Sequence, residues 1–132
     1  MITGIAHTAY VVRDMRATLR FYCDQLGFKH AFSLANQDGD PWIEYVKVAE
    51  GQFVEFFYAP PDFVPQPGSY KHLCLSVDDI HAQAGALEAA GVTLRVRPTQ
   101  GKDKNWQCWA DDPDGNPIEF MQISPESPQA KA

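Results

Sequence analysis

The segment IAHTAYVV at residues 5–12 is matched by a segment of the same kind, YKHLCLSV, at residues 70–77. Both are short, mostly apolar runs typical of β-strands, and each has a histidine, His7 or His72, at its third position. A helical pattern follows each run. The chain is therefore predicted to contain two copies of one structural module.

One register relates the two copies along most of their length. An offset of 64 or 65 residues brings together strand histidines, helix-capping aspartates, turn glycines and strand glutamates: His7 with His72, Asp14 with Asp79, Gly27 with Gly91, Gly51 with Gly115, and Glu55 with Glu119. Chance is a poor explanation for agreement at so many kinds of position with a slip of only one residue. We interpret it as an internal duplication.

Each copy predicts the element order β-α-β-β-β. The helices are expected to begin after Asp14 and Asp79 and to end near Gly27 and Gly91. Strands are expected at residues 5–12, 28–34, 41–48, 52–58, 70–77, 92–97, 106–111 and 117–123. The sequence thus predicts an α+β fold with a first module (1–58), a proline-rich linker (59–69), a second module (70–123) and a polar tail (124–132) that frays.

Composition narrows the class of protein. The 132 residues suit a single domain spanning 1–132, and a net charge of −6 disfavours nucleic acid and anionic membranes as partners. The three cysteines are an odd number, which favours free thiols over a disulfide framework. Neither a signal peptide nor a long apolar run is recognisable, so a soluble, cytoplasmic protein is expected.

Four polar side chains interrupt the apolar strands: His7, Glu55, His72 and Glu119. A carboxylate in a buried strand is costly unless it has a partner. If the two modules pack with twofold pseudosymmetry, the two His–Glu pairs can converge on one divalent metal ion, because imidazole and carboxylate suit Ni, Co, Zn, Mn or Fe. Four protein ligands on an octahedral ion leave two positions open, which is typical of a catalytic site.

The sequence resembles the vicinal oxygen chelate superfamily, the glyoxalase and bleomycin-resistance fold, along nearly its whole length. The resemblance is carried by HTAYVVRD and FYCDQLGF in the first module and by KHLCLSVDDI and DPDGNPIEF in the second. It implies two tandem βαβββ modules forming a curved, mostly antiparallel, eight-stranded cup around one divalent metal. It also places the four ligands at His7, Glu55, His72 and Glu119, as in bacterial glyoxalase I, and implies a homodimer.

The resemblance and the ligand set together predict a metal-dependent lyase or isomerase with a small carbonyl substrate. Either Glu55 or Glu119 would remove a proton next to a metal-bound carbonyl or enediol. The first strand lacks the arginine with which glyoxalase I enzymes typically hold glutathione, so the substrate stays open. The alternatives are a metal-free binding or resistance protein of the same fold, an epimerase or a dioxygenase.

Several further side chains are candidates for the wall of a substrate pocket. They are Trp42, Lys102, Trp106 and Gln107. Cys74 shares a strand face with His72 and is expected to be a small buried residue. His30 and His81 lack matched partners in the other module and are expected at the surface.

Overall fold

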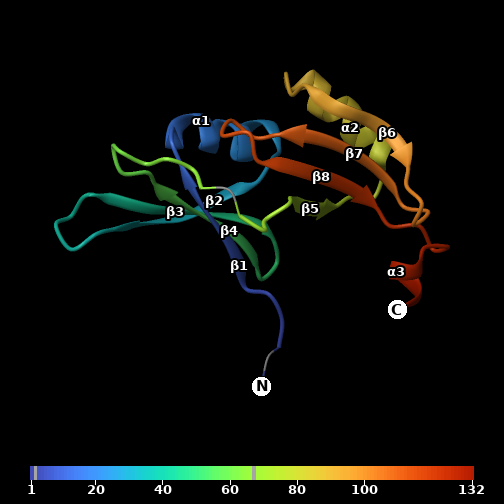
Figure 1. Cartoon of the computed structure of the whole chain (residues 1–132), viewed down its shortest axis with the longest axis horizontal. Coiled ribbons are helices and arrows are strands. Elements are labelled where there is room, and N and C mark those ends of the chain that lie inside the picture. The colour runs from blue at the N-terminus through green and yellow to red at the C-terminus, as the bar shows by residue number, and fades with distance from the viewer. Residues whose placement is uncertain (2, 67) are drawn as a thin grey trace. The chain divides into compact units, whose positions relative to one another are not determined.

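The structure is a computed structural model that describes residues 1, 3–66 and 68–132 (Figure 1). The chain divides into two compact units, Met1–Pro67 and Gly68–Ala132. Their boundary falls within the proline-rich stretch 59–69, of which residue 67 lies outside the described residues. Each unit is described by itself below.

The first unit contains one four-stranded sheet and one helical segment. Its elements are β1 (His7–Val12), α1 (Met15–Leu19), the π-helical turn η1 (Arg20–Gln25), β2 (Lys29–Ala35), β3 (Pro41–Ala49) and β4 (Gln52–Tyr58). The strand order is β1-β4-β3-β2. β1 runs parallel to β4, and the other two pairings are antiparallel.

The second unit repeats this topology. Its elements are β5 (Leu73–Ser76), α2 (Ile80–Ala89), β6 (Leu94–Gln100), β7 (Trp106–Asp111), β8 (Pro117–Gln122) and α3 (Pro128–Lys131). The strand order is β5-β8-β7-β6, again with one parallel and two antiparallel pairings. The predicted α+β fold with two βαβββ modules is confirmed, and the eight strands lie in two four-stranded mixed sheets.

The strand registers are duplicated as well as the topology. Ala9 of β1 lies opposite Glu55 of β4, and Cys74 of β5 lies opposite Glu119 of β8. The same offsets of 65 and 64 residues relate these two pairings. Side chains on alternate strand positions share a face, so the two glutamates occupy the same place in their respective sheets.

The apolar core of each unit lies between the helix and one face of the sheet. In the first unit the rings of Tyr22 and Phe56 lie 4.7 Å apart, and Val46 and Val54 are buried beside them. Because Val54 and Phe56 face the helix, Glu55 between them faces the opposite side of the sheet. The second unit has the same arrangement, with a core built around these side chains: Ile80, Leu87, Cys108, Ile118 and Phe120.

The first helix differs from its prediction beyond the first turn. The Asp14 carboxylate accepts a hydrogen bond from the Ala17 amide, as a helix N-cap should, but the α-helix gives way to η1 after Leu19. The wider π turn lets two consecutive aromatic residues, Phe21 and Tyr22, be buried together.

The C-terminal tail, which is expected to fray, contains a short helix, α3, with contacts to the rest of the second unit. The Asn105 side chain is buried, accepts a hydrogen bond from the Ser124 amide and contacts the side chain of Gln129. Buried Ser127 then caps α3 by accepting from the Ala130 amide. Among the described residues, no helix has both the length and the apolar character that a membrane span requires.

Candidate metal-binding pairs

The first candidate pair joins the start of β1 to the middle of β4. His7 Nε2 lies 3.3 Å from Glu55 Oε2, and Glu55 is only 8% exposed. The hydroxyl of Tyr45 on β3 donates a 2.7 Å hydrogen bond to the other carboxylate oxygen, Oε1. The Tyr45 ring also meets the His7 imidazole edge-on at 5.8 Å. Tyr45 thus orients both members of the pair.

The hydrogen bond to Glu55 has an electrostatic consequence. Together with burial and the carboxylate charge, it raises the pKa of Tyr45 above its ordinary value. Tyr45 therefore remains a protonated hydrogen-bond donor at physiological pH.

The second candidate pair occupies the equivalent place in the second unit. His72, just before β5, has its Nε2 3.0 Å from Glu119 Oε2, and Glu119 is 6% exposed. The Trp109 ring packs edge-on against His72 at 4.8 Å. The indole Nε1–H of Trp109 donates to Gln107 Oε1 at 2.9 Å, so this ring supports His72 without bonding to Glu119.

Tyr45 and Trp109 are equivalent residues, a relationship that sequence reasoning missed. Each lies directly opposite its unit's glutamate, and they are 64 residues apart. The signal was the duplicated register itself, which pairs these positions as surely as it pairs Glu55 and Glu119.

Cys74 departs from its expected burial. It lies on β5, an edge strand in its sheet, and is exposed as a residue, although its thiol faces Glu119. Partial burial of the thiol, together with the Glu119 carboxylate, raises its pKa to about 12. Cys74 therefore stays protonated and is a poor nucleophile or metal ligand in this state.

The two pairs have the donor chemistry of a divalent metal site. Each carboxylate is nearly buried, and in each case the basic neighbour is an imidazole rather than a lysine or arginine. Within the described part of the chain, no group of three or more His, Cys, Asp and Glu side chains is assembled to hold a metal ion. Each unit by itself offers two ligands, which fit half of a four-ligand site.

The predicted pocket residues are distributed over both faces of their sheets. Gln107 lies on the Glu119 side and contacts Trp109, whereas Trp106 packs against His81 of α2, at 5.3 Å between ring centroids, on the helix side. The structure therefore does not bring Trp106 to the face of Glu119. His81 is exposed, as expected, apart from this contact.

Trp42 and Lys102 lie in more open surroundings. Trp42 is 46% exposed at the start of β3, where it meets Phe57 edge-on and lines an open cleft of about 470 Å³ with the β2–β3 turn. Lys102 is exposed in the turn before β7. His30 is exposed, as expected, but its imidazole bonds to the buried carboxylate of Glu44.

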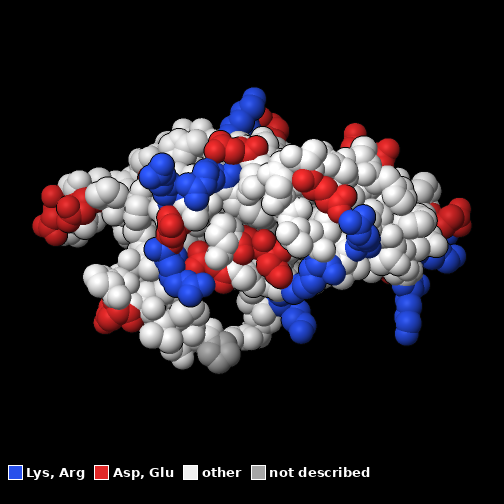
Figure 2. Space-filling model, turned by 90° about the horizontal axis from the view of Figure 1, so that it is seen from above, with Lys and Arg blue, Asp and Glu red and all other residues white. Residues whose placement is uncertain are grey.

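Charge on the surface is mixed rather than segregated. The face shown in Figure 2 has acidic and basic side chains interspersed.

Comparison with known proteins defines the family. The profile of the Glyoxalase/Bleomycin resistance protein/Dioxygenase superfamily matches residues 4–120. The uncharacterised protein YaeR of Escherichia coli K12 is 32% identical over 126 residues, covering 89% of this chain and 95% of YaeR. A lactoylglutathione lyase of Haemophilus influenzae is 29% identical over 124 residues, covering 89% and 91% of the two chains.

A solved structure agrees with these relatives. TnmS3, an antibiotic binding protein from Streptomyces sp. CB03234, has a TM-score of 0.75 and 27% identity, covering 93% of this chain and 98% of TnmS3. The chain belongs to the Glyoxalase/Bleomycin resistance protein/Dioxygenase superfamily. That superfamily is the one expected from the sequence.

Proposed function

We propose that this protein is a divalent-metal-dependent lyase or isomerase of the glyoxalase type that acts next to the carbonyl group of a small substrate. The observation that carries the proposal is the pair of equivalent His–Glu contacts, one in each unit, with both carboxylates nearly buried. The similarity to lactoylglutathione lyases supports the same class of reaction.

The proposed metal ligands are His7, Glu55, His72 and Glu119, all bound to one ion. Two ligands are too few for a stable divalent site, so two halves must combine, either within one chain or between the chains of a homodimer. The mixed nitrogen and oxygen donors suit nickel, cobalt, zinc, manganese or iron(II). Such an ion, when bound, supplies the Lewis acidity that stabilises negative charge on a substrate oxygen.

The two glutamates differ in how firmly the protein holds them. Glu55 accepts a short hydrogen bond from the Tyr45 hydroxyl. The corresponding aromatic beside Glu119 is Trp109, whose indole N–H donates to Gln107 instead. Another neighbour of Glu119 is the Cys74 thiol, a weak donor. We therefore assign Glu119 as the general base that moves the substrate proton, and Glu55 as the anchored ligand.

The side chains of β1 on the Glu55 face indicate part of the chemistry of the substrate. At the positions after His7 this strand offers Ala9 and Val11 on the Glu55 face, rather than a cation that could bind a carboxylate. Phe53 and Phe57 of β4 share that face. A compact or apolar carbonyl compound fits this surface better than a highly charged thiol adduct such as a glutathione hemithioacetal.

The proposal is tested by metal content and turnover of Glu119→Gln. Purified protein reconstituted with nickel, cobalt or zinc would be screened with methylglyoxal and several thiols, then with ketose and hydroxy-ketone substrates. We expect Glu119→Gln to lose at least 10²-fold in turnover. Undiminished turnover and metal content in this variant would overturn the assignment.

A second candidate is a metal-free binding protein, which the similarity to the antibiotic binding protein TnmS3 favours. A binder of this kind would hold its ligand without the His–Glu pairs. Ligand affinity that is unchanged by Glu55→Gln and Glu119→Gln, in protein that cannot be loaded with metal, would support the binder over the enzyme.

A further inference from the structure

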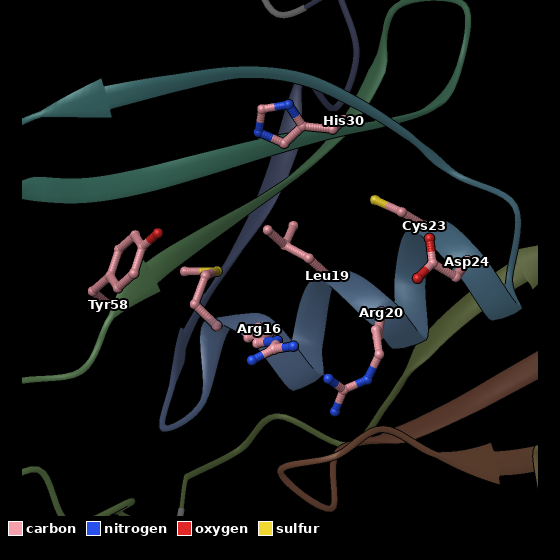
Figure 3. A pocket seen from close by; sticks show the side chains of 8 residues that line it. Arg16, Leu19, Arg20, Cys23, Asp24, His30 and Tyr58 are labelled. Carbon is pink, nitrogen blue, oxygen red and sulfur yellow. The ribbon is translucent and has the colours of Figure 1, made fainter.

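A second cavity lies wholly within the first unit, on the face of the sheet opposite to Glu55. It has a volume of about 480 Å³ and is bounded by the α1–η1 segment on one side and by β2 and the end of β4 on the other. Figure 3 shows Leu19 and Cys23 directed from the helical segment toward His30 and Tyr58 on the strands. This volume is that of a small-molecule site.

The floor of this cavity is organised by a buried carboxylate. Glu44 on β3 is 7% exposed and accepts three hydrogen bonds: from His30 Nε2 at 2.6 Å and Ser33 Oγ at 2.5 Å on Oε2, and from the Tyr58 hydroxyl at 2.9 Å on Oε1. A carboxylate is costly to bury without partners, and these three donors compensate that cost. It fixes the orientation of His30 and Tyr58 at the cavity.

The second unit shows that the fold does not require this cluster. The strand registers pair His30 with Leu94 and Glu44 with Cys108 as equivalent positions, and Cys108 is fully buried. A bulge between His30 and Phe32 aims His30 at the helix side, and the equivalent bulge in β6 aims a leucine there. The same scaffold thus has a polar floor in one copy and an apolar core in the other.

The floor keeps a hydrogen-bond acceptor beside the cavity. The Tyr58 side chain lines the cavity, and its oxygen keeps acceptor lone pairs after donating its proton to Glu44. An acceptor at this place selects a ligand with a hydrogen-bond donor, such as a hydroxyl group, at its deep end.

The rim of the cavity, unlike its floor, carries cationic hydrogen-bond donors. Arg16 and Arg20 line the cavity together with Asp24, and neither guanidinium group is hydrogen-bonded or ion-paired with another described residue. The two arginines outnumber this one carboxylate. Figure 3 shows both side chains leaving the outer side of the helical segment. The wall between floor and rim is apolar, formed by Met15 and Leu19. Unpaired arginines beside an apolar wall suit a carboxylate on an apolar body.

We propose that this cavity is a binding site for a small amphipathic carboxylate, with its hydroxyl end at His30 and Tyr58, its apolar body along Met15 and Leu19, and its carboxylate at Arg16 and Arg20. The site is separate from the His7–Glu55 pair, because the two lie on opposite faces of the same sheet. It stands whether or not the proposed enzymatic function is correct.

The proposal is tested with 4-hydroxybenzoate and two analogues that each lack one feature. 4-Methoxybenzoate removes the hydroxyl donor, and 4-hydroxybenzamide removes the carboxylate charge. Cys23 lines the cavity, so protection of Cys23 from alkylation, read by peptide mass spectrometry, reports occupancy. The background is Cys74→Ala, which removes the exposed thiol, while Cys108 is fully buried.

We expect 4-hydroxybenzoate to protect Cys23 saturably at millimolar concentration and each analogue to bind about tenfold more weakly. The double variant Arg16→Gln/Arg20→Gln should bind the acid and the amide equally, and Tyr58→Phe should bind the hydroxy and methoxy acids equally. Arg97→Gln, an exposed change in the second unit, is the control. Absent protection, or equal protection by all three compounds in the Cys74→Ala protein, would overturn the proposal even if the further variants do not fold.

Discussion

Tyr45 and Trp109 show at the scale of single residues how the two halves of the duplication have diverged. Both pack edge-on against a histidine, but only Tyr45 also donates to a glutamate. Groups that hydrogen-bond a ligand orient it and tune its affinity for metal. Phe in place of Tyr45 would keep the ring contact with His7 and remove only this hydrogen bond.

We predict that Tyr45→Phe weakens metal binding about tenfold, because Glu55 loses the donor that holds it. Affinity would be measured by competition with a chromophoric chelator. Trp109→Phe is the matched control: it preserves an aromatic ring beside His72 and removes a bond to Gln107, not to a proposed ligand. Equal effects of the two substitutions would show that the hydrogen bond to Glu55 has no special role.

Glu44 gives a pH-dependent prediction. Burial alone would raise the pKa of this carboxyl, but the hydrogen bonds from Ser33, His30 and Tyr58 outweigh burial and lower it below the ordinary value of 4.5. The stability that the ionised Glu44 adds to the folded protein is therefore complete above the unfolded-state pKa. It is lost as the pH falls through the lower folded-state pKa. The charge on Glu44 favours the folded state at neutral pH.

Glu44→Gln should accordingly lower the free energy of unfolding by about 2 kcal/mol at pH 7, because the amide cannot accept all three donors. The difference from the native protein should shrink as the pH falls below about 4.5. Urea unfolding at several pH values measures both effects. Glu50→Gln, at an exposed site, should change the stability very little. A difference that is independent of pH would contradict the role given to the Glu44 charge.

The sequence revealed the residues that repeat and missed those that do not. His7, Glu55, His72 and Glu119 are conspicuous because each is polar in an apolar strand and each has a counterpart in the other module. Their placement on one ion stays a prediction. Glu44 has no counterpart of its own kind, since the equivalent residue is Cys108, and its partners His30 and Tyr58 come from different strands. The contacts of Glu44 depend on a bulge in β2 and on the pairing of three strands, so no short stretch of sequence indicates them.

At the scale of elements, the two helix caps are the most local feature of the fold. The Asp79 carboxylate accepts from the His81 and Ala82 amides at 2.9 Å, and the equivalent Asp14 accepts from the Ala17 amide. Both were expected from sequence, since a side-chain acceptor before an amphipathic segment satisfies otherwise unpaired amides.

We predict that Asp79→Ala lowers the free energy of unfolding by about 1 kcal/mol. Asp79→Asn should retain most of that stability, because its amide oxygen still accepts the bonds. Asp62→Ala, in an exposed turn, serves as the control for removing one negative charge. Chemical denaturation at neutral pH measures all three. If the asparagine and alanine variants lost stability equally, the cap would not be the cause.

Elements were predictable where a short-range pattern decides them and less so where tertiary contacts decide them. Most strand bounds agree with expectation within a few residues because turn glycines and alternating apolar positions mark them. The π turn at Arg20–Gln25 depends on burying Phe21 and Tyr22 together, and α3 depends on buried Asn105 far away in sequence. Neither cause is visible within the segment that it shapes.

At the scale of the whole molecule, the central issue is how two equivalent units serve one function. Each unit offers a histidine and a glutamate in contact, which is half of the donor set of a four-ligand ion. Two independent sites with two ligands each would bind divalent metal only weakly, whereas a shared site would bind one ion tightly per chain. The number of metal ions bound per chain therefore distinguishes two separate sites, one in each unit, from one site shared by both.

We predict that the native protein binds one divalent ion per chain and that both pairs are needed to bind it tightly. His7→Ala/Glu55→Gln and His72→Ala/Glu119→Gln should each lower the affinity at least 10²-fold, because each leaves only two ligands for the ion. Saturating the native protein with metal at 100 times the dissociation constant should stabilise it by about 2.7 kcal/mol, and neither variant should gain this stabilisation.

Metal analysis after dialysis and thermal unfolding with and without nickel or zinc measure the two quantities. His30→Ala, which removes a histidine on the helix-covered face, should leave both unchanged. Variants that each kept half of the metal at full affinity would show instead that the two units hold separate ions.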